Sequence, residues 1–263
     1  MKKLMRFLRI WKKGAEVTVS GVMAYKTAFF ILCFSLVLGD ICIPVVSAII
    51  YNVSAGIPGW SLYEFILFQG TLIIVMGIWQ TLFADILEQV ISANQEGSFD
   101  KILLKPFSAL AFVTSNSFSA EGIAEIIAGL AIVGFALIKL NIFSALIIPY
   151  ILIILLAVIF EYSLTIITAA LSFIFVRTNK LFEVINMVEK VSRYPVTIYS
   201  PWIKFTLLFL LPAAIAAFYP VSVLLGKASI LDAAATIFSV LIFFTASLII
   251  WNFSIKRYIS AGG

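Results

Sequence analysis

Long apolar stretches without charged residues limit most strongly what this chain can fold into. The stretch AAATIFSVLIFFTASLIIWNF, residues 233–253, carries no charge along its length, and a helix needs about 20 apolar residues to cross a bilayer. Apolar residues make up 63% of the chain and charged residues 12%, whereas a soluble domain has about 25% charged residues. The apolar stretches lack the alternation of a membrane β-barrel. The sequence therefore predicts an all-α integral membrane protein.

The apolar stretches also predict where the chain crosses the membrane. Spans are expected at residues 27–51, 64–91, 110–138, 147–175 and 233–253. The polar residues TSNSFSAE near the beginning of the third span leave its start open.

The region before the last span has two interpretations. Residues 181–200 are amphipathic and carry four charged residues, and residues 205–226 are apolar but interrupted by prolines. Hydropathy alone makes residues 205–226 the fifth span and leaves residues 181–200 in the cytoplasm. In the alternative, residues 181–200 form a polar fifth span and residues 205–226 a re-entrant element, because irregular backbone at membrane depth is tolerated where protein surrounds it. Both interpretations give six spans.

Positive charges predict the orientation. The seven that precede the first span are Lys2, Lys3, Arg6, Arg9, Lys12, Lys13 and Lys26. Lys256 and Arg257 follow the last span, and the loop between the first two spans has neither lysine nor arginine. Because lysine and arginine accumulate on the cytoplasmic side, both termini are expected there. The same bias explains the net charge of +5, so no nucleic-acid partner is expected.

The first 22 residues have the pattern of a helix that lies along the membrane surface. Leu4, Phe7, Leu8 and Trp11 recur at helical spacing, and basic residues occupy the opposite side. A helix with a basic face and an apolar face lies in the membrane interface. Residues 1–22 are therefore expected to anchor the chain to lipid, or to offer a cytoplasmic partner a docking surface as well.

Residues 93–107, between the second and third spans, form a short amphipathic and charged stretch. Its notable residues are Gly97, Phe99, Asp100, Lys101, Leu103, Leu104, Lys105 and Pro106. Phe99, Leu103 and Leu104 are expected on one face with charges around them, the glycine permits a break, and the proline stops the helix. A helix this short is not stable alone. Its apolar face should therefore dock on the membrane surface or on a partner.

Acidic residues within the spans are candidates for a transport pathway. Asp40, Glu125 and Glu161 fall inside predicted spans, where an acid costs about 2.5–3.5 kcal/mol on insertion scales and should face protein or water. Each is read either as part of a pathway or as a structural partner. The chain has no histidine, and its two cysteines suit no metal cluster. GKAS at residues 226–229 resembles the end of a phosphate-binding loop, but Val221 stands where the loop requires its first glycine and Ala228 where it requires serine or threonine. ATP, if it drives the protein, must bind another subunit.

Two stretches carry a resemblance to a known family. EGSFDKILLKPFSAL resembles the G-x-x-[DE]-x-x-L-x-x-P-x-S element that follows the second span in type-2 ABC transporter permeases. SRYPVTIYSPWIKFTLLFLLPAAIAAFYPVSVLLG resembles the YP…P…P…LLG region of a bacterial and archaeal six-span subfamily. The resemblance implies that residues 1–22 are the family's elbow helix and that residues 93–107 are its coupling helix, which docks on a peripheral ATPase. It also favours the re-entrant interpretation of residues 205–226.

The resemblance further implies a function. The chain would be the permease subunit of an exporter in the inner (plasma) membrane, working as a dimer of identical or paralogous permeases with two copies of an ATPase. It would hold no cofactor itself, since ATP and Mg²⁺ would bind the ATPase. Two alternatives remain open from the residues: a self-contained ion- or proton-coupled carrier or channel that uses Glu161, and an intramembrane enzyme that uses carboxylates such as Asp85 and Glu88.

Overall fold

The described part of the chain is helical, as the sequence predicts. The computed structural model describes residues 2–54, 56–142, 144–174, 183, 187, 190–207, 213–228 and 230–258. No strand occurs among these residues. The α-helices are α1 (Lys2–Ala24), α2 (Lys26–Val53), α3 (Leu62–Phe83), α4 (Asp85–Gln95), α5 (Asp100–Leu103), α6 (Ala109–Ser115), α7 (Gly122–Leu140), α8 (Ile147–Leu171), α10 (Pro201–Phe205), α11 (Phe218–Leu224) and α12 (Ile230–Ile255), and the 3-10 helices are η1 (Val196–Ile198) and η3 (Ala213–Ile215).

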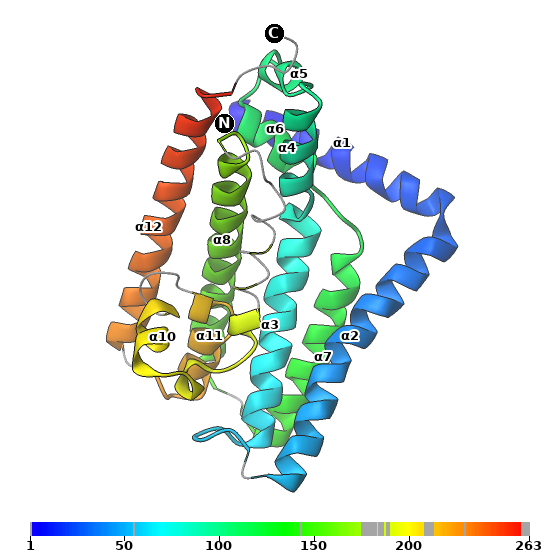
Figure 1. Cartoon of the computed structure of the whole chain (residues 1–263). Helices are drawn as coiled ribbons and strands as arrows, with labels where there is room; N and C mark the ends of the chain where they lie inside the picture. Colours follow the sequence, from blue (N-terminus) through cyan, green and yellow to red (C-terminus); the bar gives the residue numbers. More distant parts are fainter. Residues whose placement is uncertain are drawn as a thin grey trace.

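The long helices run between two opposite ends of the molecule (Figure 1). We call one the α5 end, because α5 lies there together with the beginning of α1 and the end of α12. We call the other the Trp60 end, after the loop of residues 54–61. Within the described residues, five helical segments are long and apolar enough to cross a membrane: Lys26–Tyr51, Leu62–Gln95, Gly122–Leu140, Ile147–Leu171 and Ala234–Ile255.

The structure corrects the predicted start of the third span. The expected span 110–138 is divided into α6 and α7, and its membrane-length helix begins only at Gly122. The polar residues between the two helices bond to the junction of α3 and α4: the Ser117 hydroxyl donates to Leu82 O at 2.6 Å, and Ser119 N donates to Thr81 O at 2.9 Å. Side chains and backbone from elsewhere that bond to a helix's carbonyls interrupt it. These bonds to Thr81 and Leu82 therefore mark the place where α3 ends and α4 begins, and α6 ends at Ser115 within the TSNS stretch.

Two predicted elements fall partly outside the described residues. In the range 181–200, residues 183, 187 and 190–192 are helical, and η1 follows; the rest of that range up to residue 189 is not described. In the range 205–226, residues 208–212 are not described, and η3 and α11 are.

The centre of the bundle consists of α3 and α8, and α2 lies at its edge. In the most apolar stretch of each helix, 72% of the α3 residues are buried, against 6% in α2. α8 packs on α3, α11 and α12, with the rings of Phe160 and Phe243 5.2 Å apart. α3 and α8 thus form the core, and α2 presents most of its surface outward.

Glycines bring the backbones of α3 and α7 into contact. Gly70 and Gly77 of α3 and Gly122 and Gly129 of α7 are each two helical turns apart. A Cβ atom would lie 2.8 Å from Ile126 N if added at Gly77, 2.6 Å from Gly77 O at Gly122, and 3.0 Å from Gly70 O at Gly129. Small residues permit this close approach of helices in membranes. We call this antiparallel pair the α3–α7 pair.

Polar contacts join the segment from η1 to Lys227 to the loop at the Trp60 end. The Trp60 indole donates to the Thr197 hydroxyl at 3.2 Å. Further along the chain, Lys227 Nζ lies 2.8 Å from Glu64 Oε1 and donates to Gly59 O at 3.0 Å. Thr197 and Lys227, at the two limits of this segment, therefore contact the same loop.

Candidate functional site

Phe99, predicted to lie on the docking face of the coupling helix, is instead buried. The expectation that it shares an exposed apolar face with Leu103 and Leu104 is wrong, because its exposed fraction is 0%. Its ring lies 4.8 Å from that of Phe173, 5.4 Å from Tyr258 and 6.5 Å from Trp251. Phe173 follows α8, Trp251 belongs to α12, and Tyr258 follows α12. We call the four rings the Phe99 socket.

The local turn explains why Phe99 points inward. Residues 93–107 do not form one helix: α4 ends at Gln95, α5 has four residues, and turns surround it. Gly97 has a φ of 66°, a left-handed conformation that glycine adopts at little cost. Phe99 N then donates to Ala93 O at 3.1 Å. The chain thus turns back on the end of α4 and carries the Phe99 ring into the socket.

The other side of this turn projects from the molecule. We call residues 96–107 the α5 loop; α5 lies at the tip in Figure 1. Leu104 is 84% exposed and Leu103 44%, and Lys101, Lys105 and Pro106 beside them are exposed. An exposed apolar pair with charged residues around it, on a loop whose other side packs on the bundle, fits a surface that contacts a partner or the membrane.

The α5 loop is also joined to the first helix. The ring of Phe107 stacks on that of Phe7 at 6.4 Å, and the Arg6 guanidinium lies 5.9 Å from the Phe107 centroid. Trp11 packs edge-on against Phe118 at 5.7 Å. Part of the predicted apolar face of α1 therefore packs on its own chain, while other apolar residues of α1, such as Leu8, stay exposed.

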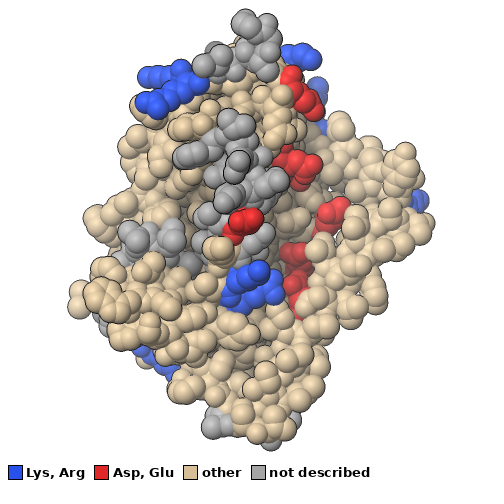
Figure 2. Space-filling view, in the orientation of Figure 1, with Lys and Arg blue, Asp and Glu red and all other residues tan. Residues whose placement is uncertain are grey.

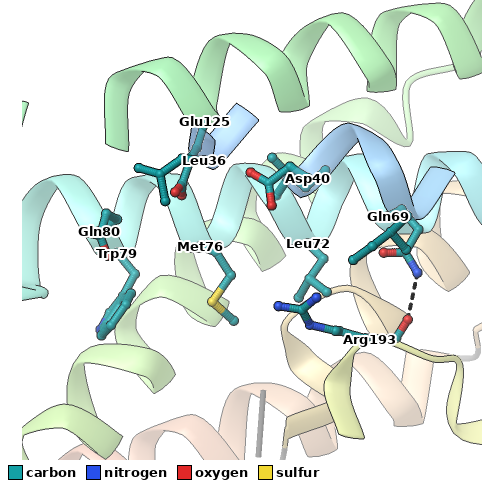
Figure 3. A pocket seen from close by; sticks show the side chains of 11 residues that line it. Leu36, Asp40, Gln69, Leu72, Met76, Trp79, Gln80, Glu125 and Arg193 are labelled. Atoms are coloured by element: carbon teal, nitrogen blue, oxygen red, sulfur yellow. Dashed lines mark hydrogen bonds between the residues drawn. The ribbon is translucent and has the colours of Figure 1, made fainter. Parts of the chain in front are cut away.

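Polar residues at mid-depth surround a cavity of about 250 Å³ between α2, α3 and α7. Figure 3 shows Asp40 and Arg193 projecting into it from opposite sides, with Glu125 further along. Gln69 Nε2 donates to Arg193 O at 2.7 Å, which fixes the backbone that carries the guanidinium. On the face in Figure 2, acidic side chains follow a hollow beside α2 and basic side chains lie next to it. The structure thus brings together two of the predicted pathway acids, Asp40 and Glu125.

Glu161, the third predicted pathway acid, lies elsewhere. It is 4% exposed, within α8, and it is not among the residues that line the cavity. Its carbonyl accepts from the Thr165 hydroxyl at 2.9 Å, and Thr165 in turn accepts from the indole of Trp79 at 2.8 Å. Trp79 lines the cavity. Glu161 therefore lies one helical turn from Thr165, the residue that bonds to Trp79 in the cavity wall.

Sequence reasoning missed the residues that surround Phe99. Phe173, Trp251 and Tyr258 gave no local signal, since their contact with Phe99 joins parts of the chain more than 70 residues apart. Arg193 did carry a signal: a cation in a candidate span is a functional-site hypothesis by default. Within the described residues, no group of three or more His, Cys, Asp or Glu side chains could hold a metal ion.

A comparison with known families covers nearly all of these features. No curated protein matches the chain. The profile of a family described as ABC-2 family transporter protein matches residues 41–262, which include the α5 loop, the Phe99 socket and most of the cavity wall. Members of that family are membrane transport components and are not themselves catalysts. With five membrane-length apolar helices among its described residues, the chain is a multi-pass membrane protein that belongs to the ABC-2 family and is the permease component of an ABC transporter.

Proposed function

We propose that the chain is the permease subunit of an ATP-driven exporter and that the α5 loop is its coupling element. A separate ATPase subunit, which binds ATP and Mg²⁺, docks on the surface formed by Leu103 and Leu104 and flanked by Lys101 and Lys105. The observation that carries the proposal is the two-sided α5 loop: Leu104 is 84% exposed while Phe99 is 0% exposed. One side is available to a partner and the other is fixed in the membrane bundle.

The Phe99 socket would transmit the movement of the ATPase. Phe99 packs against Phe173 after α8 and against Trp251 and Tyr258 at the end of α12. Interiors are packed too tightly for a buried ring to shift while its neighbours stay in place. A displacement of α5 would therefore move the ends of α8 and α12. The Phe7–Phe107 stack would carry the same displacement to α1.

We further propose six spans, with both termini and the α5 end in the cytoplasm and the membrane being the inner (plasma) membrane. Phe173 lies at the α5 end and Thr197 contacts the loop at the Trp60 end, so a crossing over residues 181–200 fits between them. Thr197 and Lys227 both contact that same loop, which supports a re-entrant segment over residues 205–226. The exposed basic side chains of α1 would then lie at the cytoplasmic surface as the elbow helix.

The functional unit would contain two permeases, identical or paralogous, and two ATPases. Most of the surface of α2 faces outward, which leaves a long apolar face for lipid or for a second permease. Transport outward is what the family resemblance implies. ATP-dependent accumulation of a cargo inside inverted membrane vesicles would support that direction, and accumulation only in right-side-out vesicles would contradict it.

Co-purification tests the coupling assignment. We would purify the tagged chain in mild detergent and identify the soluble subunits that accompany it, for the wild type and for Leu104→Asp. Leu231→Asp is the matched control, since Leu231 is 80% exposed near the Trp60 end. We expect a subunit with a phosphate-binding loop to accompany the wild type and the control and to be lost in Leu104→Asp. Retention in Leu104→Asp, or equal loss in both variants, would contradict the assignment.

A further inference from the structure

A second cavity, of about 340 Å³, lies between α2, the beginning of α3 and η1. Its described lining residues on α2 run from Cys42 to Tyr51, and the facing wall includes Phe65 of α3 and Ile198 of η1. The α2 residues belong to a helical segment long and apolar enough to cross a membrane. The Tyr51 hydroxyl donates to Trp60 O at 3.1 Å. This cavity, which we call the α2 cavity, therefore lies at membrane depth in the half of the bundle nearer the Trp60 end.

The walls of the α2 cavity suit hydrocarbon better than water. The Ser47 hydroxyl donates to Ile43 O at 2.7 Å, and the Tyr51 hydroxyl is bonded to Trp60 O, so both groups are already used within the protein. Apolar wall comes from Val46, Ile50, Ile57 and Phe65. An apolar cavity of about 150 Å³ in a soluble protein stays dry and takes up molecules such as benzene. The larger α2 cavity is therefore suited to an apolar occupant.

The α2 cavity opens sideways, toward the surroundings of α2. Val46 lines the cavity and is still 51% exposed, whereas Phe65 on the facing wall is 2% exposed. Around a membrane-spanning helix the medium at such an opening consists of lipid tails, which are as apolar as leucine. A chain that enters from the bilayer exchanges one set of apolar contacts for another and desolvates no polar group. Entry from the membrane therefore costs little.

Charged side chains limit the α2 cavity toward the middle of the membrane. Ile43 also lines the neighbouring polar cavity, into which Asp40 and Arg193 project (Figure 3). Charged groups need water or polar partners and offer hydrocarbon no favourable contact. From Ile43 to Tyr51 the axis of α2 rises about 12 Å. Tyr51 and Trp60 are aromatic residues of the kind that lie at headgroup level. The cavity is therefore suited to about 12 Å of a chain whose polar end lies beside Tyr51.

We propose that the α2 cavity binds one hydrocarbon chain of a membrane lipid from the leaflet at the Trp60 end. The chain lies between α2 and Phe65, with its methyl end toward Ile43 and its headgroup near Tyr51. While the chain is bound, this half of α2 cannot move inward onto α3, because the chain fills the space between them. The inference goes beyond the proposed function: the ligand is a lipid that stays with the protein, and its binding requires no ATPase.

Photo-crosslinking from a defined lipid tests the proposal. We would reconstitute the full chain in phosphatidylcholine vesicles that contain a phosphatidylcholine with a diazirine near the methyl end of one chain. After irradiation, mass spectrometry would locate the modified residues. We expect cross-links on Ile43 and on Phe65, which is too deeply buried for a lipid on the outer surface of α2 to reach. Ile127, 63% exposed on α7, reports ordinary contact with lipid.

Filling the cavity should remove the cross-link to Phe65. Val46→Trp should lower it about tenfold, because the indole occupies the space of the chain, and should leave the cross-link to Ile127 unchanged. Val45→Trp is the matched control, since Val45 is 53% exposed and is not among the residues that line the cavity. Ile50→Trp, nearer the Trp60 end of the cavity, should act as Val46→Trp does. The result therefore does not depend on the folding of one variant.

The position of the diazirine tests the orientation of the chain. Moving it toward the ester end should shift the cross-links from Ile43 to Ile57 and Tyr51. Cross-linking of Ile127 without Phe65 in the wild type would overturn the proposal, and so would equal cross-linking of Phe65 in the Val46 and Val45 variants. Because the vesicles contain no ATPase, these outcomes are independent of the coupling assignment.

Discussion

The two ends of this permease share ring packing and differ in their charged contacts. At the α5 end, the four rings of the Phe99 socket pack with centroids 4.8–6.5 Å apart. At the Trp60 end, one lysine makes an ion pair at 2.8 Å, a hydrogen bond and a cation–π contact with Trp60 at 5.1 Å. Ring packing depends on shape and is insensitive to salt, while ion pairs depend on charge and are screened.

The difference fits the tasks proposed for the two ends. A contact that transmits movement must hold while the elements it joins change their angle. Ring packing suits this, because it does not depend on the alignment of a hydrogen-bond donor with its acceptor. A contact that holds the segment after α11 in one position suits groups that bond in one geometry, such as the Lys227 ammonium with the Glu64 carboxylate. Lys227 joins the chain after α11 to the beginning of α3 through Glu64, and Glu64 also closes the capping box of α3 with Ser61. The Trp60 end thus adds a few discrete bonds to its ring packing, in which Trp60 lies 5.6 Å from Phe68 and 6.0 Å from Phe218.

Truncation of Phe99 should have the strongest effect. Phe99→Ala removes a fully buried ring, a change that costs about 3–5 kcal/mol in soluble cores. We expect a lower melting temperature, and ATP hydrolysis that persists without transport. Leu104→Ala is the control: because its side chain is 84% exposed, its stability should change by less than about 0.5 kcal/mol. Equal melting temperatures for the two variants would show that the socket does not hold the α5 loop.

At the opposite end, a double-mutant cycle on Glu64→Gln and Lys227→Met should give a coupling free energy smaller than the destabilisation by Phe99→Ala. The side chains are 18% and 38% exposed, so the coupling free energy should be about 1 kcal/mol, the upper range for exposed pairs. It should shrink at 1 M salt, where the Debye length is about 3 Å, whereas the effect of Phe99→Ala should not change. A coupling free energy that is insensitive to salt would remove the contrast between the two ends.

Removal of one hydroxyl should have the weakest effect. The Tyr258 hydroxyl in the socket is buried and, among the described residues, has no hydrogen-bond partner. Tyr258→Phe should therefore leave stability unchanged within about 0.5 kcal/mol or raise it. In Tyr150→Phe, the matched control, the lost hydroxyl is bonded to Thr71 at 2.8 Å, and the variant should lose about 1 kcal/mol. If the two losses are equal, the socket depends on a polar contact after all.

Hydropathy was sufficient for the long helices and insufficient where tertiary contacts determine the outcome. The apolar runs of α2, α8 and α12 were predicted because burial in lipid depends on composition alone. The start of α7 was not, because the bonds from Ser117 and Ser119 to α3 join separate parts of the chain. The orientation of Phe99 also escaped prediction, since a helix of four residues has too few turns for helical periodicity to define a face.

The candidate site was foreseen in part for the same reason. Asp40 and Glu125 could be selected because an acid in an apolar run stands out in the sequence. That they share a cavity with Arg193 and Gln69, while Glu161 does not line it, follows from how the helices are rotated about their axes. Rotation is determined by packing against neighbours, and the spans here are apolar nearly all round, so the sequence pattern gives no direction.

The glycines between α3 and α7 determine which parts of the transporter are able to move. Where backbones touch, one helix cannot slide or roll against the other without a clash, so α3 and α7 move together as one rigid unit. α2 packs beside the α3–α7 pair with little of its surface buried, and it supplies one wall of the mid-depth cavity. Of the helices that line this cavity, α2 is therefore the one whose movement meets the least packing. The width of the cavity, and with it the size of the molecule that fits, depends on the position of α2 relative to the α3–α7 pair.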